Sequence, residues 1–413
     1  MLKTELFEII ANGENSGVEF KRDDCRPEQL AKEIVAMANL RGGMILLGVE
    51  DDGVISGIHR ENLEEWIMDG VVARKVHPLL LPFYEEIQVD DGDRVAILSF
   101  TQGASKPYVC RHNDREEIFI RVGSVSRLAT REQQARLFES GGMLHAEMLP
   151  VSGTSIESLD LERVKDYLQN VVGDPDIPGS EDKWTRRLLG LGFFTEGIGV
   201  SPVCTIAGLL LFGHRPRRFL RQAGVRLMVF EDIEKGYQSK LDEVLDLPMV
   251  GLWTKGNGDE RKLATDGLIE SVVQTLRPFL SEESNVIDEG MRRERNWYYP
   301  LEAVREIFIN AFVHRDWTRF VDVEITCYSD RLEVISPGAM QNSMTVEKMV
   351  AGQRSPRNTL IVEVLRDYGY VDARGMGVRT KVIPLMRSEN GVEPIFESTE
   401  DYLKTILHRN AEQ

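Results

Sequence analysis

Hydrophobic residues recur along the chain at spacings that differ from one segment to the next. Residues 28–40, EQLAKEIVAMANL, place Leu30, Ile34 and Ala38 four positions apart, the spacing of a helix that buries one face. Gly42 follows closely, and glycine just past a periodic segment is typical of a helix C-terminus. The pattern predicts a helix that ends near residue 40.

Shorter apolar runs follow this helix. Residues 44–58, MILLGVEDDGVISGI, hold two β-rich runs on either side of Asp52-Gly53, and Asp-Gly between such runs favours a hairpin. Residues 93–100, DRVAILSF, and residues 116–124, EEIFIRVGS, read as further strands. We therefore expect an α+β domain at residues 1–140.

The rest of the chain has a different pattern. Residues 141–200 are largely polar with helical spacing and predict a helical connector, with a loop at PGSEDKW, residues 178–184. The apolar run TIAGLLLFG opens a second region of helices and strands. We expect it to form a C-terminal α/β domain at residues 201–413, and 413 residues suffice for two such domains.

Charge limits the class of partner. The formal net charge is −17, which weighs against a protein that coats nucleic acid, because phosphate affinity comes from clustered lysine and arginine. Two arginine-rich segments remain candidates for nucleic-acid contacts, one with Arg121 and Arg127 and one with Arg217 and Arg218. They form either a basic stripe or surface ion pairs with neighbouring acids.

Other classes of protein are disfavoured. No apolar run reaches the roughly 18 residues that span a bilayer, and the N-terminus, MLKTELFEII, lacks a cleavable signal pattern. We therefore expect no membrane contact and a cytoplasmic location. The four cysteines are too scattered for a zinc site or a disulfide framework, and they are Cys25, Cys110, Cys204 and Cys327.

Acidic residues gather in two stretches of the N-terminal region. Residues 14–21, ENSGVEFK, contain Glu14 and Glu19 followed by Lys21, and Glu50 and Asp51 come directly after an apolar strand. If the fold brings the two stretches together, three carboxylates suit Mg²⁺ or Mn²⁺, and Lys21 suits a phosphate. Acids beside Asn, Ser and Gly are also ordinary turn chemistry.

Three segments together, ENSGVEFK, AMANLRGGMILLGVEDDGVISGI and IFIRVGSVSRLAT, resemble the Schlafen AlbA_2 family over about residues 5–138. The resemblance implies nucleic-acid binding and, in the Schlafen branch, metal-dependent cleavage of RNA, notably transfer RNA. It implies an active site at Glu14, Glu19 and either Glu50 or Asp51.

The C-terminal region carries a second set of candidates. In YYPLEAVREIFINAFVHRDWT, Glu306 and Asn310 are four residues apart and therefore share one face of a predicted helix. An acid there can orient a water, and an amide oxygen can hold Mg²⁺ against phosphates. His314, Arg315 and Asp316, which follow the pair, are further candidates for cofactor binding. Gly375 and Gly377 are candidates as well, because a glycine loop lets backbone amides approach phosphate.

Four segments, TIAGLLLFG and residues 305–317, 330–340 and 355–379, together resemble the divergent histidine-kinase-like (GHKL) ATPase domain that follows AlbA_2 domains in bacterial proteins labelled RecG-like helicases or transcriptional regulators. The resemblance covers about residues 200–395. It implies that Glu306 orients water, that Asn310 contacts magnesium, and that the Gly375 to Gly377 loop cradles phosphate. It also implies a homo-oligomer, since related ATPase domains often dimerise.

The sequence departs from this ATPase group at one point. Ser336-Pro337-Gly338 replaces the usual Asp-x-Gly-x-Gly turn that binds adenine. The chain also lacks a Gly-x4-Gly-Lys-Ser/Thr motif and a helicase motif set, which disfavours a helicase.

Three hypotheses follow. The protein is an ATP-gated, metal-dependent endonuclease acting on RNA or DNA in a defence response, a non-catalytic ATP-responsive regulator that binds nucleic acid, or an interaction scaffold with an inactive nucleotide site. ATP binding coupled to nucleic-acid binding is common to the first two.

Overall fold

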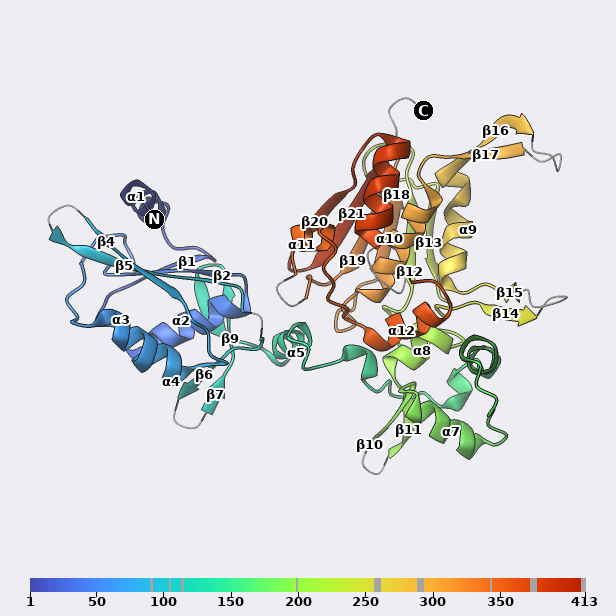
Figure 1. The fold of residues 1–413 in the computed structure, drawn as a ribbon, viewed down its shortest axis with the longest axis horizontal. Helices are drawn as coiled ribbons and strands as arrows, with labels where there is room; N and C mark the ends of the chain where they lie inside the picture. The colour runs from blue at the N-terminus through green and yellow to red at the C-terminus, as the bar shows by residue number, and fades with distance from the viewer. Residues whose placement is uncertain are drawn as a thin grey trace. The chain divides into compact units, whose positions relative to one another are not determined.

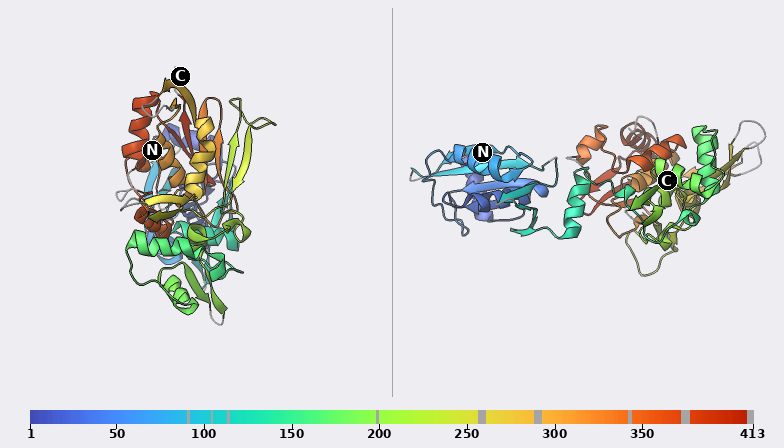
Figure 2. Two further views of the ribbon diagram at one scale, coloured as in Figure 1. Left: turned by 90° about the vertical axis from the view of Figure 1, so that its right-hand side faces the viewer. Right: turned by 90° about the horizontal axis from the view of Figure 1, so that it is seen from below.

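The chain folds into two compact units, Met1–Leu144 and His145–Gln413, shown from three sides in Figures 1 and 2. The computed structural model describes residues 1–89, 92–103, 105–112, 115–197, 200–255, 261–287, 293–341, 344–371 and 377–409. Both units combine helices with sheets, so the predicted α+β class is confirmed.

The N-terminal unit is built on a four-stranded sheet in the order β1-β2-β5-β4. Its elements are α1 (Lys3–Asn12), β1 (Val18–Lys21), α2 (Pro27–Asn39), β2 (Gly42–Leu47), α3 (Leu63–Glu65), the helical turn η1 (Trp66–Val72), α4 (Ala73–Lys75), β3 (Val76–His77), β4 (Phe83–Gln88), β5 (Arg94–Thr101), β6 (Val109–His112), β7 (Arg115–Glu117), β8 (Phe119–Val122), β9 (Val125–Leu128) and α5 (Arg131–Ser140).

The helix α2 connects the parallel pair β1 and β2, because parallel neighbours need a crossover. Its apolar positions Leu30, Ile34 and Ala38 are fully buried, as their spacing predicts. The chain then turns at Gly42, whose φ is 81°, and a Cβ there would overlap the backbone of Phe100. Only glycine fits this turn, and the predicted helix end is confirmed.

The predicted hairpin around Asp52-Gly53 forms only in part. Its turn closes, since Glu50 donates to the Val54 carbonyl at 2.8 Å. Beyond it, a single antiparallel bridge links Val49 to Ile55. The amides of Ser56 and Gly57 then both donate to the Gly48 carbonyl, at 2.9 and 3.0 Å, which ends the pairing before a second strand develops.

The C-terminal unit is built on a six-stranded mixed sheet in the order β13-β12-β18-β19-β21-β20. The unit's elements are η3 (Ala146–Met148), η4 (Ile156–Ser158), α6 (Leu161–Asp166), η5 (Tyr167–Val172), α7 (Glu181–Gly190), β10 (Phe194–Gly197), β11 (Val200–Cys204), α8 (Ile206–Phe212), η6 (Pro216–Arg218), β12 (Val225–Val229), β13 (Leu241–Leu245), β14 (Leu252–Lys255), β15 (Arg261–Thr265), α9 (Leu268–Leu280), β16 (Ser281–Ile287), β17 (Arg293–Trp297), α10 (Leu301–Val313), β18 (Val323–Cys327), β19 (Arg331–Pro337), α11 (Val346–Val350), α12 (Thr359–Asp367), η7 (Val378–Val382), α13 (Ile383–Leu385), η8 (Met386–Asn390), β20 (Ile395–Ser398) and β21 (Tyr402–His408).

One continuous core holds this unit together. The helices α9 and α10 lie along one face of the sheet (Figure 1), where α9 contacts β12 and α10 contacts β19. Val151, Leu159 and Val164 belong to the same core, so much of the segment predicted as a connector folds as part of this unit. Within the described part of the chain, no helix combines the length and apolar character needed to cross a bilayer.

Candidate functional site

A cavity of about 220 Å³ lies in the C-terminal unit, and strands of the six-stranded sheet form its floor. Leu227, Ile325, Val334, Thr405 and Phe396 follow one another across neighbouring strands in a single row. Leu227 and Ile325 are fully buried, whereas the last three residues of the row line the cavity. Because side chains alternate between the faces of a strand, the row that forms the core also forms the cavity floor.

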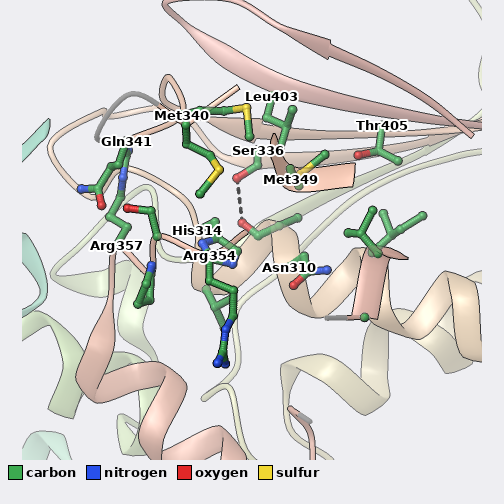
Figure 3. A pocket seen from close by; sticks show the side chains of 18 of the residues that line it. Asn310, His314, Ser336, Met340, Gln341, Met349, Arg354, Arg357, Leu403 and Thr405 are labelled. Carbon is green, nitrogen blue, oxygen red and sulfur yellow. Dashed lines mark hydrogen bonds between the residues drawn. The ribbon is translucent and has the colours of Figure 1, made fainter. Parts of the chain in front are cut away.

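The helix α10 supplies the opposite wall. Glu306, Asn310 and His314 follow at intervals of four residues and all line the cavity, as expected for one helical face. The Asn310 Nδ2 donates to Glu306 Oε1 at 3.3 Å. Figure 3 shows Asn310 and His314 directed into the cavity beside Arg354. The structure thus brings together the Glu306 and Asn310 pair that the sequence singles out.

Gly377 completes this part of the wall. A Cβ at this position would overlap the Glu306 carboxylate, so the backbone of residue 377 lies directly against that side chain. Glycine is required for so close an approach. The other glycine of the predicted phosphate loop, Gly375, lies outside the described residues.

The cavity is rich in positive charge. Arg354, Arg357, Arg366 and Arg379 line it, and Glu306 is the only carboxylate among the described residues that do so. Sequence analysis did not assign these arginines to the site. Their clustering gives an acidic chain one strongly cationic cavity, which suits a ligand with several negative charges.

His314 adds no charge to the cavity at neutral pH. Its side chain is exposed to the cavity although it lies deep within the unit. That depth, together with the charge of Arg357, lowers the pKa of His314 to about 4. The imidazole is therefore neutral at pH 7 and serves as a hydrogen-bonding group.

Arg315 does not line the cavity, contrary to its predicted role in cofactor binding. It is fully buried and donates to the carbonyls of Gln222, Arg319 and Val321 at 2.6, 2.9 and 2.9 Å. Burial lowers its pKa to about 9. Sequence proximity to Asn310 is misleading here because α10 has ended and the chain has turned into the core.

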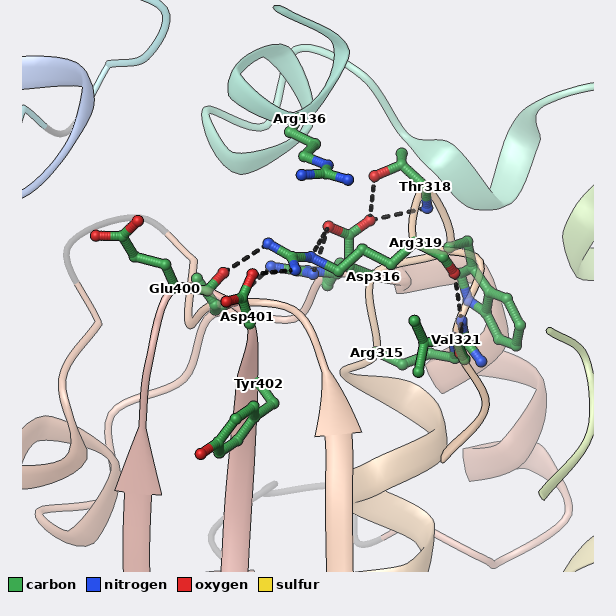
Figure 4. A network of polar contacts seen from close by, with 12 residues as sticks. Arg136, Arg315, Asp316, Thr318, Arg319, Val321, Glu400, Asp401 and Tyr402 are labelled. Atoms are coloured by element: carbon green, nitrogen blue, oxygen red, sulfur yellow. Dashed lines mark hydrogen bonds and ion pairs between the residues drawn. The ribbon is translucent and has the colours of Figure 1, made fainter. Parts of the chain in front are cut away.

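Asp316 is likewise a structural residue, part of a network of polar contacts with Arg319 and Thr318 (Figure 4). Its carboxylate accepts from the Thr318 amide and hydroxyl at 2.8 and 2.6 Å. It also pairs with Arg319 at 3.5 Å and with Arg357 at 3.6 Å. Arg357 does line the cavity, so Asp316 acts on the site through that guanidinium.

In the N-terminal unit the structure brings together several of the predicted acids. The Glu14 carboxylate accepts from the Phe20 amide at 2.9 Å. The pKa of Glu14 is raised above its ordinary value, chiefly by burial and also by the negative charges of Glu19 and Asp51. The hydrogen bond from Phe20 offsets only part of this rise. Glu19 is buried and pairs with Lys21. Glu14 therefore lies within electrostatic reach of Glu19 and Asp51, but Glu19 is already neutralised by a cation.

Arg121 is the second cation on Glu19, and its position corrects the prediction that it contacts nucleic acid. Its side chain is fully buried and pairs with Glu19 at 2.5 Å and with Glu33 at 2.8 Å. It also donates to the Asn15 carbonyl at 2.9 Å. Ser126 binds the same Glu33 carboxylate. Arg121 thus joins β1, α2, β8 and β9 at one buried point.

A divalent metal does not fit this arrangement. The Glu19 carboxylate is occupied by two cationic side chains, Asp51 is exposed, and Glu50 lies 3.9 Å from Arg22. Among the residues that the structure describes, no group of three or more His, Cys, Asp or Glu is placed to hold a metal ion.

The remaining predicted nucleic-acid contacts differ in accessibility. Arg127 on β9 and Arg218 are exposed. Arg217 is paired with Asp322 at 2.5 Å. Two of the four arginines are therefore available at the surface.

Family models match both units. Residues 14–130 match the model described as "Schlafen, AlbA_2", and residues 321–407 match that described as "Putative ATP-dependent DNA helicase recG C-terminal". The N-terminal unit is therefore similar to Schlafen AlbA_2 domains and part of the C-terminal unit to the RecG-like family, and the resemblance seen in the sequence is confirmed. The second match begins after α10, so the roles of Glu306 and Asn310 depend on the cavity geometry.

Two solved structures are similar. The DIP2311 protein from Corynebacterium diphtheriae is 21% identical, with 98% of this chain and 80% of that chain covered and a TM-score of 0.44. The N-terminal domain of an ATP-dependent DNA helicase RecG-related protein from Nitrosomonas europaea is 19% identical, with 31% of this chain and 91% of that chain covered and a TM-score of 0.23. No curated protein matches the chain.

Replacing Arg121 tests its role in the core. Arg121→Leu leaves Glu19 and Glu33 buried without this shared cation, and we expect the N-terminal unit to lose about 3–5 kcal/mol of stability. Hydrogen exchange of β1 and α2 peptides in the full-length protein measures the loss. Arg127→Leu, on the exposed face of β9, is the control and should change exchange by less than about 0.5 kcal/mol. Equal protection in both variants would show that the buried pairs contribute nothing.

Proposed function

We propose that the protein binds ATP in the cavity of the C-terminal unit and nucleic acid through the AlbA_2 domain, and that the nucleotide regulates nucleic-acid binding. The observation that carries the proposal is the convergence of Glu306, Asn310 and Gly377 on one wall of a cavity lined by four arginines. This combination provides a water-orienting acid, an amide, a close backbone approach and positive charge, which are the groups that a nucleoside triphosphate requires.

The wall residues also suit a magnesium ion bound with the nucleotide. Asn310 uses its nitrogen to donate to Glu306, so its oxygen is the atom that suits a metal. Mg²⁺ takes few protein ligands when phosphates supply the others, and it would neutralise phosphate charge. Glu306 would orient a water toward the terminal phosphate, while the arginines would hold the phosphate oxygens.

For the AlbA_2 domain we propose nucleic-acid binding without cleavage. Glu19, a member of the candidate carboxylate set, is held by Lys21 and Arg121. A carboxylate paired with two cations is a poor ligand for a divalent metal, because the metal would have to displace buried partners. This pairing favours the regulator over the endonuclease.

A physical link between the nucleotide cavity and the AlbA_2 domain starts at Glu147. This residue lies three positions after the N-terminal unit ends and is fully buried. Its carboxylate accepts from the amides of Leu360 and Ile361 at 2.9 and 3.0 Å and from the Thr359 hydroxyl at 3.2 Å. It therefore caps the first turn of α12.

The helix α12 belongs to the cavity wall. Val362 and Arg366 on this helix line the cavity, and Arg357 lies just before its start. A shift of α12 on nucleotide binding would therefore reach Glu147 and the chain segment that leads to the AlbA_2 domain. This provides a route, through the hydrogen bonds of Glu147 and the chain that precedes it, by which the nucleotide regulates nucleic-acid binding.

Calorimetric titration of the full-length protein with ATP and Mg²⁺ tests the nucleotide site. We expect Asn310→Ala to weaken binding about tenfold, the loss of one charge-assisted contact, and Gly377→Ala to abolish it by displacing Glu306. Gly190→Ala is the control, because no atom lies within 4 Å of the added Cβ. If the unaltered protein bound no ATP, the site would be inactive and the scaffold hypothesis would replace this one.

Fluorescence anisotropy with duplex DNA and with transfer RNA, with and without ATP, tests the regulation. We expect ATP to change the affinity of the unaltered protein for duplex DNA or for transfer RNA. Glu147→Gln, which weakens the cap on α12, should retain ATP binding and lose most of this change. Thr359→Val removes one hydrogen bond from the same cap and should give a smaller loss. An undiminished ATP effect in Glu147→Gln would contradict the route, and degradation of either nucleic acid that requires Glu19 would contradict binding without cleavage.

A further inference from the structure

The four arginines that line the cavity differ in how firmly they are held. Arg357 is 6% exposed, whereas Arg354, Arg366 and Arg379 are exposed. An exposed guanidinium is screened by water and has to be ordered when a ligand binds. A buried guanidinium acts where the dielectric constant is lower, and it is already in position. Of these four arginines, Arg357 is therefore the one prepared in advance to hold an anionic ligand.

A carbonyl and a carboxylate hold the Arg357 guanidinium. Its Nη2 donates to the Ala339 carbonyl at 2.5 Å, and its Nη1 lies 3.6 Å from the Asp316 carboxylate. The carbonyl fixes one side of the planar group and the carboxylate fixes another. The direction in which the guanidinium faces the cavity therefore depends on Asp316, although Asp316 itself does not line the cavity.

The Ser336-Pro337-Gly338 turn makes room for this contact. A Cβ at Gly338 would overlap both the Arg357 guanidinium and the Asp316 side chain. The φ of Gly338 is 113°, which also favours glycine. This is the turn that replaces Asp-x-Gly-x-Gly in the sequence. The departure from the ATPase group thus places a paired cation beside the turn.

Asp316 is itself fixed from several directions. In addition to its hydrogen bonds from Thr318, its amide donates to the Pro337 carbonyl at 2.8 Å. On another side it pairs with Arg319, which is bound in turn to Asp401 at 2.7 Å (Figure 4). A carboxylate that is oriented in this way can orient a neighbouring guanidinium.

Both members of the pair are anchored to the end of α10. Asp316 follows that helix directly in the chain. Asn358, the residue after Arg357, is fully buried and donates to the carbonyls of Val313 and Arg315 at 2.8 and 3.0 Å. The pair is therefore fixed to the helix that carries Glu306 and Asn310.

The charge of Arg357 acts inside the cavity. Burial and, in addition, this charge lower the pKa of His314, which lines the α10 wall. Figure 3 shows Arg357 and Gln341 on one side of the view, with His314 between Arg357 and Asn310. The guanidinium is thus within electrostatic reach of the wall that carries the candidate nucleotide-binding residues.

We propose that Arg357 binds the phosphate chain of the nucleotide and that Asp316 is the positioning residue that holds Arg357 in place. A guanidinium binds phosphate oxygens through charge-assisted hydrogen bonds. This inference rests on the proposed function, since it assigns a role within the same site.

Replacing Asp316 distinguishes positioning from a simple effect of charge. A carboxylate close to the cavity repels a polyanion, so charge alone predicts that Asp316→Asn strengthens ATP binding. Positioning predicts the opposite sign. We expect Asp316→Asn to weaken ATP binding about tenfold, as the loss of a partner that orients a ligand-binding side chain does. Asp401→Asn removes a carboxylate that pairs with Arg319 instead, and it should change the affinity by less than about twofold.

Calorimetric titration of the full-length protein with ATP and with inorganic triphosphate, each with Mg²⁺, tests both roles. We expect Arg357→Gln to weaken both ligands about thirtyfold, the low end for losing a charged contact shielded from water. Arg354→Gln, which removes an exposed arginine of the same cavity, should weaken them only about threefold. In the Arg357→Gln background, Asp316→Asn should change ATP affinity by less than about twofold, because Asp316 acts through Arg357.

Thr318→Val provides a second test of positioning without any change of charge. It removes the hydroxyl that donates to Asp316 at 2.6 Å and should weaken ATP binding about threefold, the value of one hydrogen bond. If Asp316→Asn does not fold, an unchanged ATP affinity in Thr318→Val would still contradict positioning.

Three other results would overturn the inference. They are ATP binding by Asp316→Asn that equals or exceeds that of the unaltered protein, an equal effect of Asp316→Asn with and without Arg357, and an unchanged triphosphate affinity in Arg357→Gln. In each case the unaltered protein would still bind ATP, and the proposed function would stand. Failure of the unaltered protein to bind ATP would instead overturn the proposed function itself.

Discussion

The packing of α10 against one face of the six-stranded sheet is the constraint on which the candidate site depends. The helix contacts β19, and Leu227 and Ile325 in the row that crosses this strand are fully buried core residues. Further along the same row, Val334 and Thr405 line the cavity. Because side chains alternate between the two faces of each strand, this one row supplies both core residues and the cavity floor opposite Glu306 and Asn310.

Charge is distributed unevenly in this protein, and the distribution separates the two units by function. A chain of net charge −17 collects four arginines around a cavity of the C-terminal unit, where their combined positive potential attracts a polyanion. In the N-terminal unit the buried charges instead neutralise one another, with Arg121 between Glu19 and Glu33. Charged side chains thus line a cavity in one unit and cross-link elements in the other.

Periodicity predicted the elements that carry the site. The helix α2 follows from apolar spacing, and in α10 the four-residue interval between Glu306 and Asn310 was sufficient to place them on one wall. Arg121 was misassigned because it points inward on β8 at a position where a strand usually buries an apolar residue, and its partner Glu33 is 88 positions away. Arg354 and Arg366 were missed because a loop and a separate helix bring them to the cavity, which no local spacing encodes.

A crystal structure of the protein with Mg²⁺ and a non-hydrolysable ATP analogue tests the central claim most directly. We expect phosphate oxygens beside Gly377 and the arginines and a metal ion on the Asn310 oxygen. An analogue bound elsewhere, or bound in this cavity with its phosphates over the apolar floor, would contradict it.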